Sequence, residues 1–433
     1  MILIGTMLLM LPQSARHAPV SFVDALFTAT SATCVTGLTV LDTGKTYSIL
    51  GQLVILTLIQ LGGLGIMTFT TFFIFLVMGK FSLSDRDVIQ ETITQAPFRN
   101  LAGLLKIVFL ATMLIELVGA GLLTICFSHR FAQVEAIYYG VFHAVSAFCN
   151  AGFSLFPNNL MDYRGDWAVN IIVMALIIAG GIGFMVLFEL KQYLTSRQSS
   201  LRKTLSFHSK FALLLTAILI AGGAIMLFGL EFKNVLLGQS ISVQILVPIF
   251  QSVTSRTAGF NTVDIGQLTD SSLSIIILLM FIGASPGSCG GGIKTTTAGV
   301  VFGMLLSRLE NRPWVNVSHH RIPYETVSRA ISIAFFSLVV IAIATILLMT
   351  IEKGWTPHSL TRGMFLESLF EVVSAFGTVG LSTGITSGLS NMGKVVLIFV
   401  MFIGRVGPLT VVLAIAKKEQ QRIKYAQVNV LVG

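Results

Sequence analysis

The sequence predicts an all-α membrane protein in which four parallel repeats, each a span, a re-entrant P-loop and a second span, surround one pore. Three observations predict this fold. First, 54% of the 433 residues are hydrophobic and 11% are charged, whereas soluble globular chains carry about 25% charged residues. Second, uncharged segments such as 50–78 and 331–351 exceed the about 20 residues that a helix needs to cross a bilayer. Third, a short run containing a glycine recurs four times along the chain.

The four runs share the position of their glycine and the large apolar residue after it. They are TCVTGL at 33–38, FCNAGF at 148–153, RTAGF at 256–260 and FGTVGL at 376–381. Ser31, Ser146 and Ser374 occupy one shared position before the glycine, where the third run has Val253. A single glycine would indicate no more than close helix packing. Four copies at spacings of roughly 105 to 120 residues instead indicate one unit repeated four times.

These runs place the repeats at 1–78, 79–190, 191–306 and 307–416, followed by a cytoplasmic C-terminal tail at 417–433. Residues 1–12 are apolar but lack the basic start and the cleavage site of a signal peptide. We therefore expect them to be the end of a first span whose beginning is missing.

The second repeat shows the expected elements most clearly. An apolar span at 104–127 and an amphipathic segment at 136–148 precede the glycine run, and a second apolar span follows at 167–190. The amphipathic segment is too short to cross, so it predicts a re-entrant half-helix buried in protein around a water-filled cavity. Two crossings per repeat give about eight transmembrane helices. Each repeat then begins and ends on the same side, which makes the repeats parallel, with pseudo-fourfold symmetry, rather than inverted.

A glycine-rich segment interrupts the second span of the third repeat. Residues 283–297 read GASPGSCGGGIKTTT, and a helix cannot continue through them because glycine and proline leave backbone groups that need partners at this depth. The segment superficially resembles a phosphate-binding loop, but Ile293 separates Gly292 from Lys294 and no strand precedes it, so we reject nucleotide binding there. We interpret it as a flexible gate beneath the glycine runs.

Arg405 lies inside the last span, at the place that matches this glycine-rich break. An ionisable group in a span is costly and usually faces a cavity or a partner. One interpretation from the residues alone is a structural pair with Glu116 or with loop carbonyls. Glu116 is the only acid clearly in the middle of a span, and the sequence leaves its partner open.

The distribution of charge predicts the orientation. Lysine and arginine are concentrated in segments 79–106, 191–210, 308–329 and 417–424, on the side away from the glycine runs. By the positive-inside rule this side is cytoplasmic, and the runs open outward. The net charge of +9 therefore reports orientation, and we expect no nucleic-acid partner. The outer side holds fewer basic residues: Arg16, Lys45, Arg130, Arg164, Lys233, Arg256, Lys353, Arg362 and Lys394.

The acids favour the outer side, where a negative vestibule would concentrate cations. They are Asp24, Asp42, Glu135, Asp162, Asp166, Glu231, Asp264, Asp270, Glu352, Glu367 and Glu371. No acid enters the four runs themselves, which favours selection of a weakly hydrated monovalent ion by backbone carbonyls over a carboxylate ring for a divalent ion. Glycine permits the torsions that turn successive carbonyls toward an axis. The candidate filter residues are Val35, Thr36, Gly37, Asn150, Ala151, Gly152, Thr257, Ala258, Gly259, Thr378, Val379 and Gly380.

These features resemble the Trk/Ktr/HKT superfamily of potassium transporters, and within it the bacterial Ktr-type membrane subunits. The resemblance covers essentially the whole chain, and its most specific parts are TAGFNT at 257–262, TVGLSTG at 378–384 and SPGSCGGGIKT at 285–295. It implies that the filter carbonyls hold K⁺. No second glycine follows the large residue of each run, unlike the potassium-channel signature, so fewer ion sites are expected. The implied gate comprises Gly283, Ala284, Ser285, Pro286, Gly287, Ser288, Cys289, Gly290, Gly291, Gly292, Lys294 and Arg405. The resemblance implies that Arg405 is a positive barrier below the filter that contacts this loop, and Lys294 would add to it.

The resemblance also implies the setting of the protein. It implies a multi-pass protein of the bacterial plasma membrane, surrounded by lipid, that forms a homodimer and binds a cytosolic regulatory ring of the KtrA type. ATP or ADP would bind that ring, Na⁺ would act as an activator, and this chain itself would carry no cofactor. The four cysteines lack CxxC spacing, and we expect free thiols.

Three functions were weighed. A gated, channel-like subunit for sodium-dependent K⁺ uptake agrees best with the four runs. An alternating-access cation symporter is disfavoured by the parallel repeats and by the scarcity of carboxylates in the spans. A membrane-embedded enzyme is disfavoured because no nucleophile, base and orienting acid occur together. We therefore expect a transport protein and not an enzyme.

Overall fold

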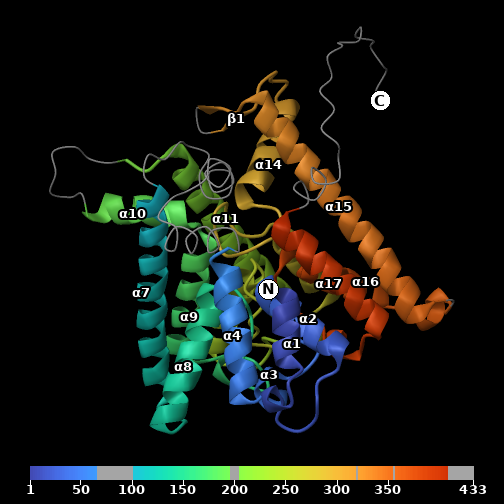
Figure 1. Cartoon of the computed structure of the whole chain (residues 1–433). Helices are drawn as coiled ribbons and strands as arrows, with labels where there is room; N and C mark the ends of the chain where they lie inside the picture. The colour runs from blue at the N-terminus through green and yellow to red at the C-terminus, as the bar shows by residue number, and fades with distance from the viewer. Residues whose placement is uncertain (66–100, 196–203, 318–319, 355, 408–433) are drawn as a thin grey trace.

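The computed structural model describes residues 1–65, 101–195, 204–317, 320–354 and 356–407. The described chain is a bundle of helices with one antiparallel hairpin, β1 (Asn316–Val317) and β2 (His320–Arg321) (Figure 1). The end of the expected span at 50–78, the start of the second repeat at 79–100 and the tail at 417–433 lie outside the described residues.

Grouped by the expected repeats, the helices recur in one order: a first helix, a buried helix before the glycine run, and a second helix. The first repeat has α1 (Ile2–Leu9), α2 (Phe22–Thr33), the short α3 (Thr43–Thr46) and α4 (Ile49–Gly63). The second has α7 (Leu101–Phe127), α8 (Gln133–Phe148), α9 (Trp167–Gly181) and α10 (Phe184–Thr195). The third has α11 (Phe207–Glu231), α12 (Ile241–Thr254), α13 (Asp270–Phe281) and α14 (Thr295–Leu309), and the fourth has α15 (Tyr324–Lys353), α16 (Met364–Gly377) and α17 (Asn391–Val406).

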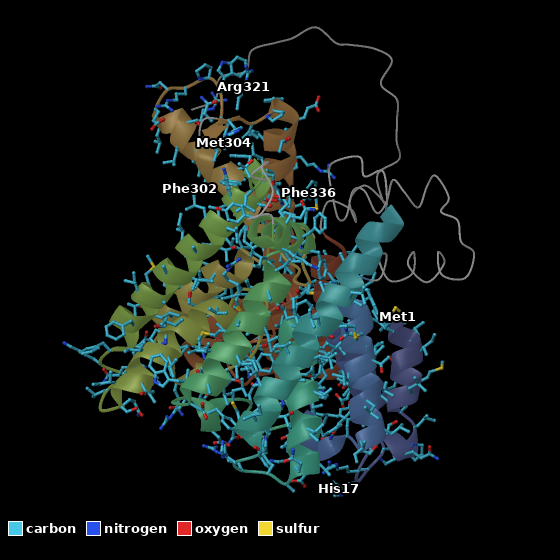
Figure 2. The ribbon with its side chains drawn as sticks, turned by 90° about the vertical axis from the view of Figure 1, so that its left-hand side faces the viewer. Met1, His17, Phe302, Met304, Arg321 and Phe336 are labelled. Carbon is cyan, nitrogen blue, oxygen red and sulfur yellow. The ribbon has the colours of Figure 1, made fainter. Side chains whose placement is uncertain are left out.

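The long helices present apolar side chains outward. Among the described residues, α11, α15 and residues 108–127 of α7 are long and apolar enough to cross a membrane. Leu114 and Leu117 on α7, Ile225 on α11 and Ile346 on α15 are each more than half exposed. Exposed leucine and isoleucine on such helices are what a lipid environment requires. Figure 2 shows His17 at one end of the molecule and Arg321, which stacks on Trp314 at 3.4 Å, at the opposite end.

The second helices are shorter than the sequence predicts. The expected continuous span at 167–190 is wrong, because α9 and α10 meet at a bend of 105°. Gly183 lies at the bend with a φ of +98°, and the N–H of Phe184 donates to the carbonyl of Gly287 at 2.9 Å. The glycine-rich loop at 283–297 therefore occupies the place where the helix would have continued. In the described parts of the chain, length and composition alone identify three helices that could cross a membrane, or four if the bent pair is one span.

Each second helix begins with a polar N-cap that accepts a backbone N–H of its first turn. Ser48, Asp166, Thr269 and Ser390 make these bonds at 3.1 to 3.3 Å. Such caps stabilise a helix by about 1 kcal/mol each. Because the caps recur in all four repeats, they fix the same point of entry after each glycine run.

The core surrounds the four helices that precede the runs. Phe27, Phe142, Phe250 and Phe370 lie about ten residues before the four glycines and are fully buried. The large residues after the glycines are buried as well, as the recurring apolar residue at this position predicts. Burying a phenylalanine side chain contributes about 1.5 to 3 kcal/mol. These side chains therefore hold α2, α8, α12 and α16 inside the bundle.

Candidate functional site: the four glycine runs

The four glycines lie next to one another in a closed ring. A Cβ atom added to Gly37 would lie 3.0 Å from the Cα atom of Gly152, and one added to Gly152 would lie 3.0 Å from that of Gly259. A Cβ atom added to Gly259 would lie 3.2 Å from the Cα atom of Gly380, and one added to Gly380 would lie 2.8 Å from that of Gly37. Because any side chain would meet the backbone of the next run, only glycine allows this approach.

The backbone of each run is left-handed at two positions. The four glycines have φ values of +92°, +69°, +77° and +91°. Two residues earlier, Val35, Asn150, Thr257 and Thr378 have φ values of +56°, +59°, +78° and +50°. A positive φ is rare outside glycine, and for a β-branched residue it is a genuine outlier. Strained torsions of this kind cluster at functional sites, and here they occur at the same place four times.

Hydrogen bonds from the preceding helix hold this backbone. The residue before the glycine donates its N–H to the carbonyl of the serine six positions before the glycine: Thr36 to Ser31, Ala151 to Ser146 and Val379 to Ser374, at 2.7 to 2.8 Å. The hydroxyls of Ser31 and Ser374 also accept the N–H of their glycines at 3.1 Å. In these three repeats the shared serine lies in the last turn of its helix and holds the backbone of the run.

In the third run Thr254 takes this place, and the expectation that Val253 occupies it is wrong. The carbonyl of Thr254 accepts the N–H of Ala258 at 2.9 Å. Its hydroxyl donates to the carbonyl of Phe260 at 2.7 Å, as the hydroxyl of Ser146 does to that of Phe153 at 2.8 Å. In the third run the bonding residue therefore lies five positions before the glycine rather than six, which counting back from the glycine does not reveal.

A second polar side chain on each of these helices contacts the segment that follows the glycine. We call Thr28, His143, Gln251 and Glu371 the anchor residues. Thr28 accepts from the hydroxyl of Tyr47 at 3.1 Å, His143 Nε2 lies 2.9 Å from Ser154 Oγ, and Gln251 donates to Thr262 at 3.5 Å. Glu371 is fully buried, so the expectation that it faces an open vestibule is wrong.

Neighbouring repeats also meet through the segments after the runs. Gly44 packs against the carbonyl of Leu155, and Leu160 donates to the carbonyl of Asn261 at 3.1 Å. Gly266 packs against Thr383, whose carbonyl oxygen would lie 2.9 Å from a Cβ atom added to Gly266. Lys394 forms an ion pair with Asp24 at 2.7 Å. These contacts run from the first repeat through the fourth and back to the first.

The glycine-rich loop contacts the base of the runs. The N–H of Gly291 donates to the hydroxyl of Thr378 at 2.9 Å, and Gly290 abuts the hydroxyl of Thr257. Gly283 donates to the carbonyl of Ile293 at 2.8 Å, which brings the two ends of the loop together. The loop therefore touches the two residues of strained backbone that belong to the third and fourth runs.

The same loop packs against the broken helix of the second repeat. Ser285 and Cys289 donate their N–H groups to the carbonyls of Gly181 and Gly180 at 3.0 and 3.1 Å. The loop backbone thus finds partners without water, as backbone at membrane depth must.

Arg405 and Lys294 both bind loop carbonyls. Arg405 donates to the carbonyls of Cys289 and Gly62, and Lys294 donates to that of Gly290 at 2.6 Å. Of the structural pairs considered for Arg405, the structure has the one with loop carbonyls. Glu116 instead accepts from Gln60 Nε2 at 3.1 Å and lies 3.8 Å from Cys149 Sγ.

Arg256 differs from its sequence-based interpretation as an outer charge. It is 7% exposed at the end of α12, and its guanidinium lies 3.5 and 3.4 Å from the carbonyl and hydroxyl of Thr216. The sequence signal for the burial of Arg256 is its position directly before Thr257, because that position lies at the end of a buried helix. The expectation of free thiols is confirmed for all four cysteines.

Comparison with known proteins gives one consistent result. A family model described as TrkH, a cation transport protein, matches residues 1–425. The chain is 41% identical to the Ktr system potassium uptake protein B of Bacillus subtilis (strain 168), covering 100% of this chain and 94% of that protein. It is 36% identical to the potassium/sodium uptake protein NtpJ of Enterococcus hirae, covering 100% and 95% of the two chains.

The fold is also similar to that of a solved structure, the potassium transporter TrkH from Vibrio parahaemolyticus. The TM-score is 0.70 with 18% sequence identity, and the match covers 92% of this chain and 79% of the other. The matching family and the similar proteins are transporters, so the chain is not an enzyme. Its full-length family match and its identity with these proteins show that the chain belongs to the TrkH family of cation transport proteins.

Proposed function

We propose that this chain is the potassium-conducting membrane subunit of an uptake system, and that the ion passes through the ring of four glycine runs. The observation that carries the proposal is the ring itself, with left-handed backbone at the glycine and again two residues before it. Alternating torsions turn successive carbonyl oxygens the same way. A ring of such oxygens replaces the water shell of a dehydrated cation. Potassium appears in the names of both relatives, with sodium beside it in the Enterococcus name.

In this proposal the four repeats are related by pseudo-fourfold symmetry about the ion path. The filter is formed by the runs from Val35, Asn150, Thr257 and Thr378 to their glycines, which contain no acidic side chain. Neutral carbonyls bind a monovalent ion weakly enough for it to leave. The hydroxyl of Thr36 is buried without a protein partner, which supports exposure of the first run to ions or water.

The glycine-rich loop is the gate in this proposal. Its contacts with Thr257 and Thr378 support a closed position directly beneath the filter. Arg405 and Lys294 add positive charge to the loop, and both side chains are bound to its carbonyls. Opening the path then requires these charge-assisted bonds to break, at a cost of about 1.5 to 3 kcal/mol for each one.

The wider setting follows from the relatives and the charge pattern. Basic connectors predict that the gate side is cytoplasmic and that the filter faces outward across a bacterial plasma membrane. The name of the Bacillus relative refers to a Ktr system, which supports work with a further, regulatory component. In this proposal the chain forms a homodimer, and the regulatory component is a KtrA-type cytosolic ring that binds ATP or ADP. Sodium dependence is supported by the potassium/sodium name of the Enterococcus relative.

Rubidium flux into liposomes that contain the purified full chain tests the proposal. For channel-like permeation we expect uptake to follow an imposed membrane potential, and external K⁺ to compete more strongly than Na⁺. Uptake that saturates and ignores the membrane potential would overturn the proposal in favour of an alternating-access cation symporter.

A further inference from the structure

Glu371 binds the segment after the fourth glycine run more extensively than any other anchor residue binds its own segment. Its Oε1 atom accepts from the hydroxyl of Ser382 at 2.5 Å and from the N–H of Thr383 at 3.0 Å. Its Oε2 atom accepts from the hydroxyl of Thr386 at 2.6 Å. The carboxyl group is fully buried, and these donors all follow Gly380 in the chain.

Each of the other anchor residues makes one hydrogen bond to the segment that follows its own run. His143 and Gln251 contact one hydroxyl at 2.9 and 3.5 Å, and Thr28 contacts the hydroxyl of Tyr47 at 3.1 Å. Glu371 binds three residues of its segment through both carboxyl oxygens. Among the four anchors, it therefore holds its run by the largest number of hydrogen bonds.

One helix holds the fourth run on both sides of its glycine. Ser374 on α16 accepts the N–H of Gly380 at 3.1 Å, and Glu371, one turn earlier on the same helix, binds Ser382. The carbonyls between these two attachments span a distance that α16 fixes. The segment also packs on the third repeat, where the carbonyl of Thr383 closes the space beside Gly266. Loss of the Glu371 attachment would release the outer part of the run.

We propose that Glu371 is a positioning residue for ion selection, which keeps the carbonyls of the fourth run at the spacing that K⁺ requires without contacting the ion. This inference rests on the proposed function of the ring as a filter. A carbonyl ring discriminates between K⁺ and Na⁺ through its size and its stiffness. A fourth run without the Glu371 attachment is less stiff, and its carbonyls can move closer to the smaller ion. Na⁺ permeation therefore rises relative to that of K⁺.

The test is Glu371→Gln in the full chain, reconstituted in liposomes. The amide keeps the shape of the side chain but offers one acceptor oxygen in place of two, so one of the hydroxyl donors loses its acceptor. We expect Rb⁺ uptake to persist while the ratio of Rb⁺ to Na⁺ flux falls about tenfold, which corresponds to about 1.4 kcal/mol in relative ion free energy. Ser382→Ala and Thr386→Val remove the donors singly and are expected to lower the ratio by less.

Glu352→Gln is the matched control. Glu352 is also an acid that accepts from a serine, with Ser390 N and Oγ at 2.9 and 2.8 Å, but it lies at the end of α15 and binds the N-cap of α17 rather than a segment directly after a run. We expect this variant to lower the thermal unfolding temperature and to leave the flux ratio unchanged. An equal fall of the ratio in Glu352→Gln would overturn the inference, because the effect would then be general.

Wild-type flux ratios in Glu371→Gln and in both donor variants would also overturn it. If Glu371→Gln fails to fold, Ser382→Ala and Thr386→Val decide the question, because each leaves the carboxylate with other donors. Gly380→Ser separates this inference from the proposed function. If Gly380→Ser changes the ratio of Rb⁺ to Na⁺ flux while Glu371→Gln and the two donor variants do not, only the positioning role of Glu371 is rejected. If Gly380→Ser leaves the ratio unchanged, the proposed filter is rejected.

Discussion

In the ring of glycine runs the four repeats share one backbone pattern, whereas in the layer beneath it each repeat differs. Every run has the same two left-handed positions and a fully buried phenylalanine on the helix before it. Beneath the ring, α9 bends into α10, α13 gives way to the glycine-rich loop, and α17 carries Arg405. An ion on an axis needs the same contacts from every side, whereas a gate needs one element that moves.

The ring and the glycine-rich loop are also stabilised in different ways. The ring is held by short bonds within each repeat, such as those from Ser31 and Ser374 to the glycines of their runs. The loop is held by bonds to other repeats, through Gly181, Arg405 and Thr378. A substitution in the ring should therefore alter which ion passes, and one in the loop should alter how often the path opens.

The largest effect is expected from a side chain in the ring. Gly259→Ser and Gly380→Ser should each reduce Rb⁺ uptake or its selectivity over Na⁺ by about tenfold or more, because a left-handed serine in the closed ring costs at least about 1 to 3 kcal/mol. Both glycines have φ values above +70° and lie against the neighbouring run. Uptake and competition by Na⁺ in liposomes measure the effect.

Gly222→Ser on α11 is the control for these variants, since no atom lies within 4 Å of a Cβ added there. It should retain uptake and selectivity. Wild-type behaviour of Gly259→Ser and Gly380→Ser together would refute the filter assignment.

The second effect concerns the loop. Removal of Gly290, Gly291 and Gly292 should raise the flux that occurs without a regulatory partner, because the contacts with Thr257 and Thr378 are lost. Loss of about 1.4 kcal/mol from the closed state would raise the open fraction about tenfold. The ratio of Rb⁺ to Na⁺ flux serves as an internal control and should stay near wild type. An unchanged leak in liposomes counts against the gate.

The fold class and the position of the ring could be predicted because they depend on pattern. Composition indicates a membrane protein, and the fourfold recurrence identifies Gly37, Gly152, Gly259 and Gly380 before any geometry is known. The positive φ values of Val35, Thr257 and Thr378 could not be predicted, because β-branched residues normally indicate extended backbone. The surrounding bonds, not the local preference, decide these torsions.

Other features depend on contacts between distant segments. Hydropathy is continuous across 167–190, so nothing local indicates that a loop from the third repeat meets the chain at Gly183. Glu371 has the sequence surroundings of an outer acid, and its burial follows from the donors that Ser382 and Thr386 supply. Thr254 replaces Val253 because the residue that bonds the third run lies five rather than six positions before its glycine.

The smallest effect is expected at the bend of the second repeat, where the two regions meet. Gly183→Ala places a Cβ atom 2.5 Å from the carbonyl of Pro286, at a φ of +98°. A left-handed alanine costs about 1 to 2 kcal/mol, and the loop must shift to make room. We expect a thermal unfolding temperature a few degrees lower and a modest rise in ungated flux, with selectivity unchanged. Gly121→Ala on α7, with no atom within 4 Å of the added Cβ, is the control and should match the wild type. A change in selectivity without a change in leak would contradict the division between ring and loop, because the atoms nearest to a Cβ atom on Gly183 belong to Pro286 and Gly287 of the loop.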